Sequence, residues 1–195
     1  MRHDSVIADL PGGTTFYFVR HGATAANATN VRCGGDVDLP LLPIGVTQAH
    51  AVAATIRARA LPIPLVISSS LMRARQTAEI VSAALGDLPI VLEPLFDERR
   101  LGTLNGASVP MTESLLAAEP APPSVEPLQA FEERVSQAFS QHGHAFAHGA
   151  LLVSSRGVAR MISRLLNVVE HVPVGNGELI EYRLELGRHT CRLLV

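Results

Sequence analysis

Short apolar runs alternate along this chain with segments of helical periodicity, and this alternation constrains the fold more than any other feature. The apolar runs cover 14–19, 64–69, 90–95, 150–155, 178–186 and 189–195, and the helical segments cover 45–61, 71–85, the first part of 130–149, and 157–166. Strands that alternate with helices are typical of a parallel sheet with helices on both faces. We therefore predict an α/β fold, a three-layer α/β/α sandwich with a mostly parallel central sheet. The last two runs, joined near Gly187, predict a closing hairpin.

The length of the chain indicates one domain. Its 195 residues are enough for one well-buried core and few for two. We expect residues 1–13, which lack an apolar signal core, to form an N-terminal tail, and residues 14–195 to form a single domain. The proline-rich stretch 117–127 interrupts the alternation and predicts an irregular insertion.

Composition excludes several classes of partner. Only 17% of the residues are charged, against about 25% in typical globular chains, and the net charge is −2. These values argue against a nucleic-acid-binding face, and no apolar run is long enough to span a membrane. Two cysteines, Cys33 and Cys191, make no disulfide framework. We expect a protein of a reducing compartment, the cytoplasm, with no nucleic-acid or membrane partner.

The basic residues are unusual in kind. All sixteen are arginines, so the chain has neither a phosphate-loop lysine nor a lysine that forms a Schiff base. Recognition of phosphate or carboxylate must therefore use arginine, histidine, hydroxyl groups or backbone amides.

Polar residues follow three of the predicted strands. Arg20 and His21 follow the first, Arg73 stands just after a serine run that we expect to cap its helix, and Ser155 and Arg156 follow the late strand. In open α/β sheets, ligands bind beyond the carboxyl ends of the strands. An arginine at a helix N-terminus opposes the helix dipole, but together with the free amides it also makes an anion site. The pattern favours a phosphate-sized dianion, although each arginine taken alone is as readily explained as a surface residue.

His21 is the candidate nucleophile. Neighbouring arginines disfavour protonation of an imidazole, and a neutral imidazole nitrogen can attack phosphorus. The alternative is a structural histidine that only donates a hydrogen bond. Phosphoryl transfer also needs positive charge on the equatorial oxygens and a proton for the leaving oxygen.

Five segments of the chain resemble, in order, motifs of the histidine phosphatase superfamily, in its phosphoglycerate mutase-like branch. The first is FVRHGATAAN, which contains His21, and the second has Leu42 where the family has threonine. The five segments are 18–27, 34–49, 67–81, 95–106 and 171–185. The resemblance covers most of the chain and implies the phosphoglycerate mutase-like fold.

The resemblance also implies site residues. His21 would be the nucleophile that forms a phosphohistidine, and Glu98 would protonate the leaving group, with Asp97 as the competing acid. Arg20, Asn27 and Arg73 would bind the phosphoryl group, with Thr24 nearby. No metal and no cofactor are implied.

One position departs from the family pattern. Relatives carry a second histidine after the late strand, in a Ser-His-Gly-Gly corner, and here Ser155 stands in its place, followed by Arg156 instead of glycine. Ser155 can donate one hydrogen bond without positive charge, and Arg156 supplies that charge if its side chain folds into the crevice. A slow enzyme, a rewired enzyme and a phosphate-binding protein without useful turnover all fit this change.

We predict a metal-independent phosphomonoester hydrolase acting through His21 on a phosphorylated small molecule. Hydrolysis is preferred to mutase-type phosphoryl transfer because the segment between Gly106 and the late strand is short and proline-rich. The other alternative is an impaired member that binds phosphorylated ligands or a protein partner. The histidines of 142–148 have metal-like spacing but no acidic or cysteine neighbours, so we expect no metal site. A homodimer through an edge strand is conceivable.

Overall fold

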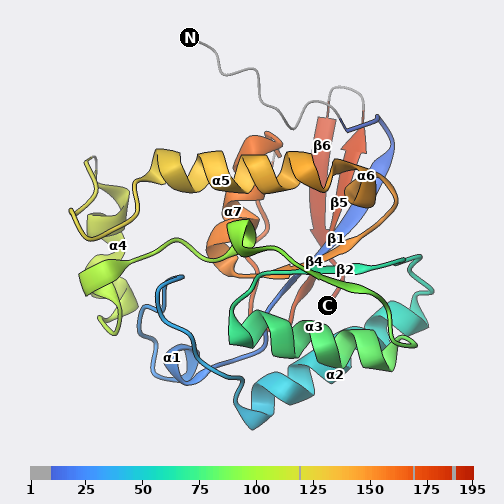
Figure 1. The fold of residues 1–195 in the computed structure, drawn as a ribbon, viewed down its shortest axis with the longest axis horizontal. Coiled ribbons are helices and arrows are strands. Elements are labelled where there is room, and N and C mark those ends of the chain that lie inside the picture. The colour runs from blue at the N-terminus through green and yellow to red at the C-terminus, as the bar shows by residue number, and fades with distance from the viewer. Residues whose placement is uncertain (1–9, 119, 169, 186–187) are drawn as a thin grey trace.

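The computed structural model describes residues 10–118, 120–168, 170–185 and 188–195. A six-stranded sheet forms the centre, and helices cover both of its faces (Figure 1). The strands are β1 (Thr14–Arg20), β2 (Val66–Ser68), β3 (Ile90–Leu92), β4 (Leu151–Ser154), β5 (Leu179–Glu185) and β6 (Arg188–Leu193). The helices are α1 (Ala25–Ala28), α2 (Pro43–Ala58), α3 (Met72–Ala84), α4 (Val109–Ala117), α5 (Leu128–Gln141), α6 (Gly143–Ala147) and α7 (Arg156–Leu165).

The sheet has the strand order β3-β2-β4-β1-β5-β6. The first four strands run parallel, and β5 and β6 are antiparallel to their neighbours. The predicted α/β fold with a mostly parallel sheet is therefore confirmed. The closing hairpin is also present, while its turn at 186–187 lies outside the described residues, as do residues 1–9 of the predicted tail.

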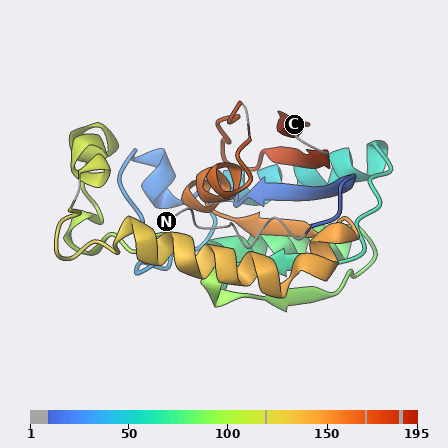
Figure 2. The same ribbon diagram turned by 90° about the horizontal axis from the view of Figure 1, so that it is seen from above.

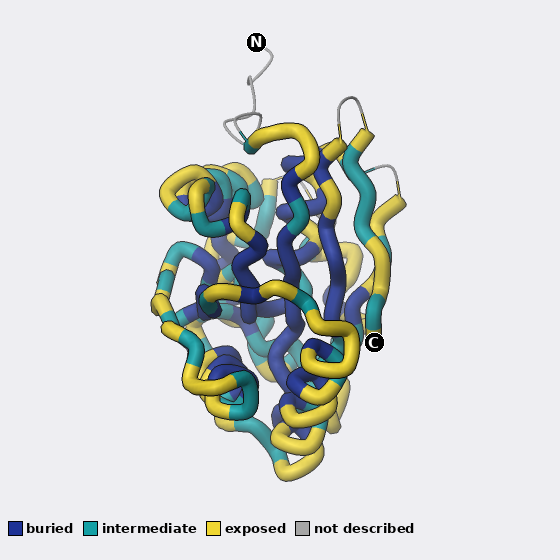
Figure 3. The backbone as a smooth tube through the Cα atoms, turned by 90° about the vertical axis from the view of Figure 1, so that its right-hand side faces the viewer, coloured by how far each residue is buried: buried dark blue, intermediate teal, exposed yellow. Residues whose placement is uncertain are grey.

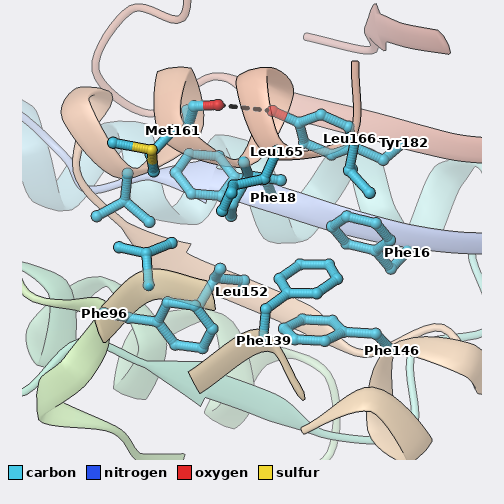
Figure 4. Close-up of a cluster of buried hydrophobic side chains, with 14 of the residues drawn as sticks. Phe16, Phe18, Phe96, Phe139, Phe146, Leu152, Met161, Leu165, Leu166 and Tyr182 are labelled. Carbon is cyan, nitrogen blue, oxygen red and sulfur yellow. Dashed lines mark hydrogen bonds between the residues drawn. The ribbon is translucent and has the colours of Figure 1, made fainter. Parts of the chain in front are cut away.

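Alternation of side chains along the central strands builds two cores. Phe16, Phe18 and Leu152 point to one face, where α5, α6 and α7 pack around a cluster of aromatic rings (Figure 4). Tyr17 and Val153 point to the other face, where they meet α2 and α3. Figure 2 shows the strands lying side by side, and Figure 3 shows that the buried residues concentrate in them. Strands buried on both faces are typical of a parallel sheet between helices.

Three local details differ from the sequence prediction. Helix α4 was not predicted and stands apart from the sheet (Figures 1 and 2). Helix α2 begins at Pro43, two residues earlier than expected, and ends at Ala58. The predicted serine cap of α3 is wrong: Leu71 occupies the cap position, and the carboxylate of Asp38 accepts the hydrogen bond from the Met72 amide at 2.7 Å.

The carboxyl ends of β1 and β4 lie side by side. Their register pairs Arg20 with Ser154, and the amide of His21 continues the ladder by donating to the Ser154 carbonyl oxygen at 2.9 Å. The residues that follow these two strands therefore emerge together at one edge of the sheet. Within the described residues, no helix has the length and apolar character that a membrane crossing requires.

Candidate functional site

A pocket of about 560 Å³ opens at this edge of the sheet. The structure brings all eight residues predicted for the site into its lining. They come from the end of β1 and the loop after it, from α1 and α3, from the start of α7 and the residue before it, and from the loop before Gly102: Arg20, His21, Thr24, Asn27, Arg73, Glu98, Ser155 and Arg156.

His21 is held in one orientation. Its side chain is 4% exposed, and Nδ1 lies 2.8 Å from the Gly22 carbonyl oxygen, to which it donates. This bond places the proton of the neutral ring on Nδ1 and leaves Nε2 with a free lone pair. Burial, and then the charges of Arg73 and Arg20, hold the pKa of His21 well below its usual value of 6.5. The imidazole is therefore neutral at physiological pH, as nucleophilic attack requires.

The loop that carries His21 packs tightly against α2. A Cβ on Gly22 would lie 2.3 Å from the carbonyl oxygen of Gly45. The Gly22 amide donates to the Thr77 hydroxyl at 3.1 Å, and the Ala23 amide donates to Oε1 of Gln48 at 2.8 Å. Backbone-to-backbone contact of this kind requires glycine, which explains why the sequence has glycine at both positions.

Two buried arginines face His21. Arg73 is 1% exposed, and it donates to the carbonyl oxygens of Val37 and Gly34 at 2.9 and 3.2 Å. Arg20 is 8% exposed and donates through Nη1 to the Val174 carbonyl at 3.1 Å. Among the described residues, neither guanidinium forms an ion pair with a carboxylate. Buried charge without a counterion is costly, so the pair is suited to receive an anion.

The buried end of the pocket, where Arg20, His21 and Ser155 lie, is its bottom. Two donor groups there have no hydrogen-bond partner. They are Nε of Arg20 and Oγ of Ser155, and both atoms are buried. Ser155 is 2% exposed and precedes α7, at the N-terminus of that helix. Buried polar atoms are normally hydrogen-bonded, and an unpaired one calls for an explanation such as a missing ligand. Burial and the nearby charge of Arg156 lower the pKa of Arg20 to about 10, so it remains a cation at neutral pH.

Asn27 is oriented by its neighbours. Its Oδ1 accepts hydrogen bonds from the amide and hydroxyl of Thr24, each at 3.0 Å, and from Nδ2 of Asn176 at 3.1 Å. The saturated oxygen leaves the Asn27 amide nitrogen as the group that can donate to a ligand. Thr24 therefore acts on the site by fixing Asn27. Asn176 also donates to the carbonyl oxygen of His21 at 3.0 Å.

The two candidate acids have different environments. Glu98 lines the pocket, where Oε2 accepts from the Gly157 amide at 2.9 Å and Oε1 accepts from the Arg99 amide at 2.8 Å. Asp97 points away and binds the residues that follow β2, accepting from Ser69 and Ser70 at 2.6–2.8 Å. Geometry therefore favours Glu98 as the group that can reach a ligand. A Cβ at Gly157 would lie 2.0 Å from Oε1 of Glu98, which makes that glycine necessary to the arrangement.

Several pocket residues were not predicted from the sequence. Arg32 connects the loop after α1 to α4, donating to Thr112 and Val109 and pairing with Glu113 at 2.5 Å. Arg160 lies one turn after Arg156 on α7. The absence of lysine pointed to arginine as the anion-binding residue but not to these two positions. Asn176 stands in the closing segment that carries the family resemblance.

The histidines near the end of α6 pair with each other. The rings of His144 and His148 are 4.3 Å apart, and Nδ1 of His148 lies 2.8 Å from the His144 carbonyl oxygen. In the part of the chain that the structure describes, no cluster of three or more histidine, cysteine or acidic residues could hold a metal ion.

Comparisons with known proteins agree with this architecture. A family model described as the histidine phosphatase superfamily (branch 1) matches residues 16–194. "Probable phosphoglycerate mutase GpmB" of Yersinia pestis (strain Pestoides F) is 42% identical over 93 residues, which make up 48% of this chain and 41% of that protein. The alignment thus spans less than half the length of this curated relative.

Solved structures match almost the whole chain. The phosphoglycerate mutase from Thermus thermophilus superposes with a TM-score of 0.70 at 32% identity, covering 93% of this chain and 96% of that one. The α-ribazole phosphatase from Shigella flexneri gives a TM-score of 0.75 at 24% identity, covering 92% and 95%, which is a likeness of fold. Since the family match extends from β1, which delivers Arg20 to the pocket, to the strands that close the sheet, this chain belongs to branch 1 of the histidine phosphatase superfamily.

Proposed function

We propose that this protein hydrolyses a phosphomonoester through a phosphohistidine on His21, with no metal ion. One observation carries the proposal. A buried imidazole with its proton on Nδ1 and a free Nε2 lies near two buried arginines that have no carboxylate partner among the described residues. This combination suits in-line attack on a phosphoryl group, because the nucleophile is neutral and the positive charge is already in place.

The reaction has two steps. In the first, Nε2 of His21 bonds to phosphorus while the bond to the ester oxygen breaks, and Glu98 gives a proton to that oxygen. In the second, water bonds to phosphorus, the phosphorus–nitrogen bond breaks, and Glu98 takes the proton from the water. One carboxyl group thus serves as acid and then as base, and ends in its starting state.

The phosphoryl oxygens would be held by the donors at the bottom of the pocket. Arg20 and Arg73 supply charge, Asn27 supplies its amide with Thr24 behind it, and the unpaired hydroxyl of Ser155 supplies one further hydrogen bond. In this proposal Ser155 takes the place of the family's second histidine. The lost imidazole lowers the rate without removing the nucleophile, because deleting one preorganised donor commonly costs about 10²–10³-fold.

Hydrolysis is favoured over mutase-type transfer. A mutase must hold a bisphosphate intermediate and exclude water, and this needs more chain over the pocket. Among the described residues between Gly106 and β4, those that line the pocket come from the short α4 and from the first turn of α5.

A second candidate function is binding without turnover. The replacement of histidine by Ser155 supports it, since a phosphate site can persist when the rate is lost. The assay that follows separates the two.

Phosphate release from phenyl phosphate should be measured for the wild type and for His21→Ala between pH 5.5 and 7.5. We expect turnover that falls more than about 10³-fold in the variant, because no other group takes over the attack. His50→Ala, at an exposed position of α2, is the matched control and should keep the wild-type rate. Turnover that survives in His21→Ala would contradict the mechanism. Phosphate binding with no His21-dependent turnover would favour the second candidate.

The same assay tests Glu98. Glu98→Gln should slow phenyl phosphate by about 10²–10³-fold, in the range of general acid catalysis. In kcat/KM, which reports the first step, it should slow 4-nitrophenyl phosphate much less, since that leaving group needs no proton. Equal losses on the two substrates would remove Glu98 from the role of acid.

A further inference from the structure

Arg156 and Arg160 form a second concentration of positive charge in the pocket. They lie four residues apart on α7, so they share one face of the helix, and both line the pocket. Like charges at this spacing destabilise a helix, and an arginine in the first turn also opposes the helix dipole. The arrangement is therefore unfavourable for the helix itself.

Nothing in the described chain compensates these two charges directly. Neither side chain forms a hydrogen bond or an ion pair there, in contrast to Arg164, which pairs with Glu132 at 3.3 Å on the next turn. The neighbouring cation, Arg32, is engaged by α4 and adds further positive charge. Glu98 and Glu113 attract Arg156 from farther away.

This charge borders the phosphoryl site and extends from it toward solvent. The charges that lower the pKa of His21 are those of Arg73 and Arg20, whereas Arg156 acts on Arg20 and is itself affected by Arg160 and Arg32. Arg156 is half-buried and Arg160 is exposed, so the two lead from the pocket bottom toward solvent. A pocket of about 560 Å³ has the size of sites for whole small molecules and holds far more than a phosphoryl group.

We propose that Arg156 and Arg160 form a second anion-binding subsite, and that the substrate is a small phosphomonoester with a second negatively charged group, a carboxylate or a phosphate. The proposal rests on the proposed function for the site of the first phosphoryl group. It assigns Arg156 and Arg160 to substrate selection, outside the bond-breaking step. Guanidinium groups suit this role because their planar donors match both carboxylate and phosphate.

Binding of inert phosphonates tests the subsite without any turnover. Calorimetric titration should compare propylphosphonate, 3-phosphonopropionate and 1,3-propanediphosphonate, which share one chain and differ in the second group. We expect the two ligands with a second anionic group to bind about 5- to 30-fold more tightly than propylphosphonate, the range for a charge-assisted contact at a partly exposed site. The better of the two identifies the second group.

Variants locate the effect. Arg160→Gln should reduce the preference for ligands with a second anionic group, and the double variant Arg156→Gln with Arg160→Gln should abolish it. In both variants the affinity for propylphosphonate should change less than about threefold. Arg188→Gln, an exposed position at the start of β6, makes the same charge change far from the pocket and should keep the preference. Thermal unfolding of each variant confirms that it is folded.

Equal affinity for all three ligands in the wild type, or a preference that persists in the double variant, would overturn the subsite. Loss of the preference in Arg188→Gln would show that the preference depends on the net charge of the protein and not on a subsite. These results are independent of the hydrolase proposal. His21-dependent turnover without the preference contradicts the subsite alone, and the preference without turnover contradicts the hydrolase alone.

Discussion

The bottom and the mouth of the pocket are built in different ways. At the bottom, Arg20, His21 and Ser155 stand at the ends of sheet strands and are buried, and the amide of His21 bonds to the backbone of the neighbouring strand β4. At the mouth, Arg32, Glu113, Arg156 and Arg160 come from helices and a loop, and of these Glu113 and Arg160 are exposed to solvent. The comparison teaches that the sheet fixes the groups proposed for the chemistry. Less buried positions of α7, a helix whose other face packs in the core, carry the charge proposed to choose the substrate.

The largest effect should follow from changing the bottom of the pocket. Arg20→Gln removes a buried cation next to His21, so we expect kcat/KM for phenyl phosphate to fall about 10²–10³-fold, as for other preorganised donors. It should also raise the pKa of His21, because one of the two repelling charges is gone. The acid limb of the pH–rate profile would move upward, toward 6.5. Because the same substrate is used with the wild type and the variant, ionisation of the substrate cannot cause a difference between the two pH–rate profiles.

The pH dependence of the free energy of unfolding is a second test of the effect of Arg20 on the pKa of His21. Below pH 6.5 the unfolded chain takes up a proton on His21 while the folded protein does not, so the free energy of unfolding falls as the pH falls. This dependence should weaken in Arg20→Gln and remain in Arg20→Lys, which keeps the charge. An acid limb and a stability profile that both stay fixed in Arg20→Gln would show that the arginine does not act on the imidazole.

A smaller effect, of opposite sign in two measurements, is expected at Ser155. Its hydroxyl is buried without a partner, so Ser155→Ala removes an unsatisfied polar group and should leave the free energy of unfolding unchanged or slightly higher. Affinity for inorganic phosphate should nevertheless fall, about 3- to 10-fold, because one hydrogen bond to the anion is lost. Chemical denaturation and phosphate titration measure the two. A variant that is destabilised but binds phosphate normally would make Ser155 a structural residue.

The sequence predicted the bottom of the pocket much better than its mouth. The strands that end at Arg20 and Ser154 could be recognised from apolar runs, and parallel strands bring their carboxyl ends to one edge. Alternation of helix and strand thus placed His21, Arg73 and Ser155 together without any knowledge of side-chain contacts.

The mouth depends on contacts that have no local pattern. Three residues of α4 bond to Arg32, which lies 77–81 positions earlier in the sequence. No periodicity in the sequence predicts such a pairing. The cap of α3 was misassigned for the same reason, since its acceptor is the distant Asp38 rather than a local serine. The sequence analysis did not single out Arg160, because only the fold shows which face of α7 borders the pocket.

The smallest effect should come from the mouth. Glu113 pairs with Arg32, and its side chain is 63% exposed, so Glu113→Gln should lower the free energy of unfolding by about 0.2–1 kcal/mol, as for exposed pairs. The hydrogen bond from Arg32 lowers the pKa of Glu113. The contribution of the pair is therefore present above pH 4.5 and lost as the pH falls through the lowered value. Chemical denaturation at pH 7 and at pH 3.5 measures this difference.

Ligand binding should change in the opposite direction. Glu113 attracts Arg156 and so competes with an incoming anion, which means that its neutralisation should tighten binding of 3-phosphonopropionate by about two- to threefold at low salt. The gain should vanish at high ionic strength, because screening acts on exposed charges first. Arg32→Gln is the matched comparison: it breaks the same pair but removes a cation, so it should weaken binding. If both variants shift affinity in the same direction, the position of α4 rather than the local charge controls ligand affinity at the mouth. The bottom and the mouth of the pocket would then differ in how firmly their residues are held.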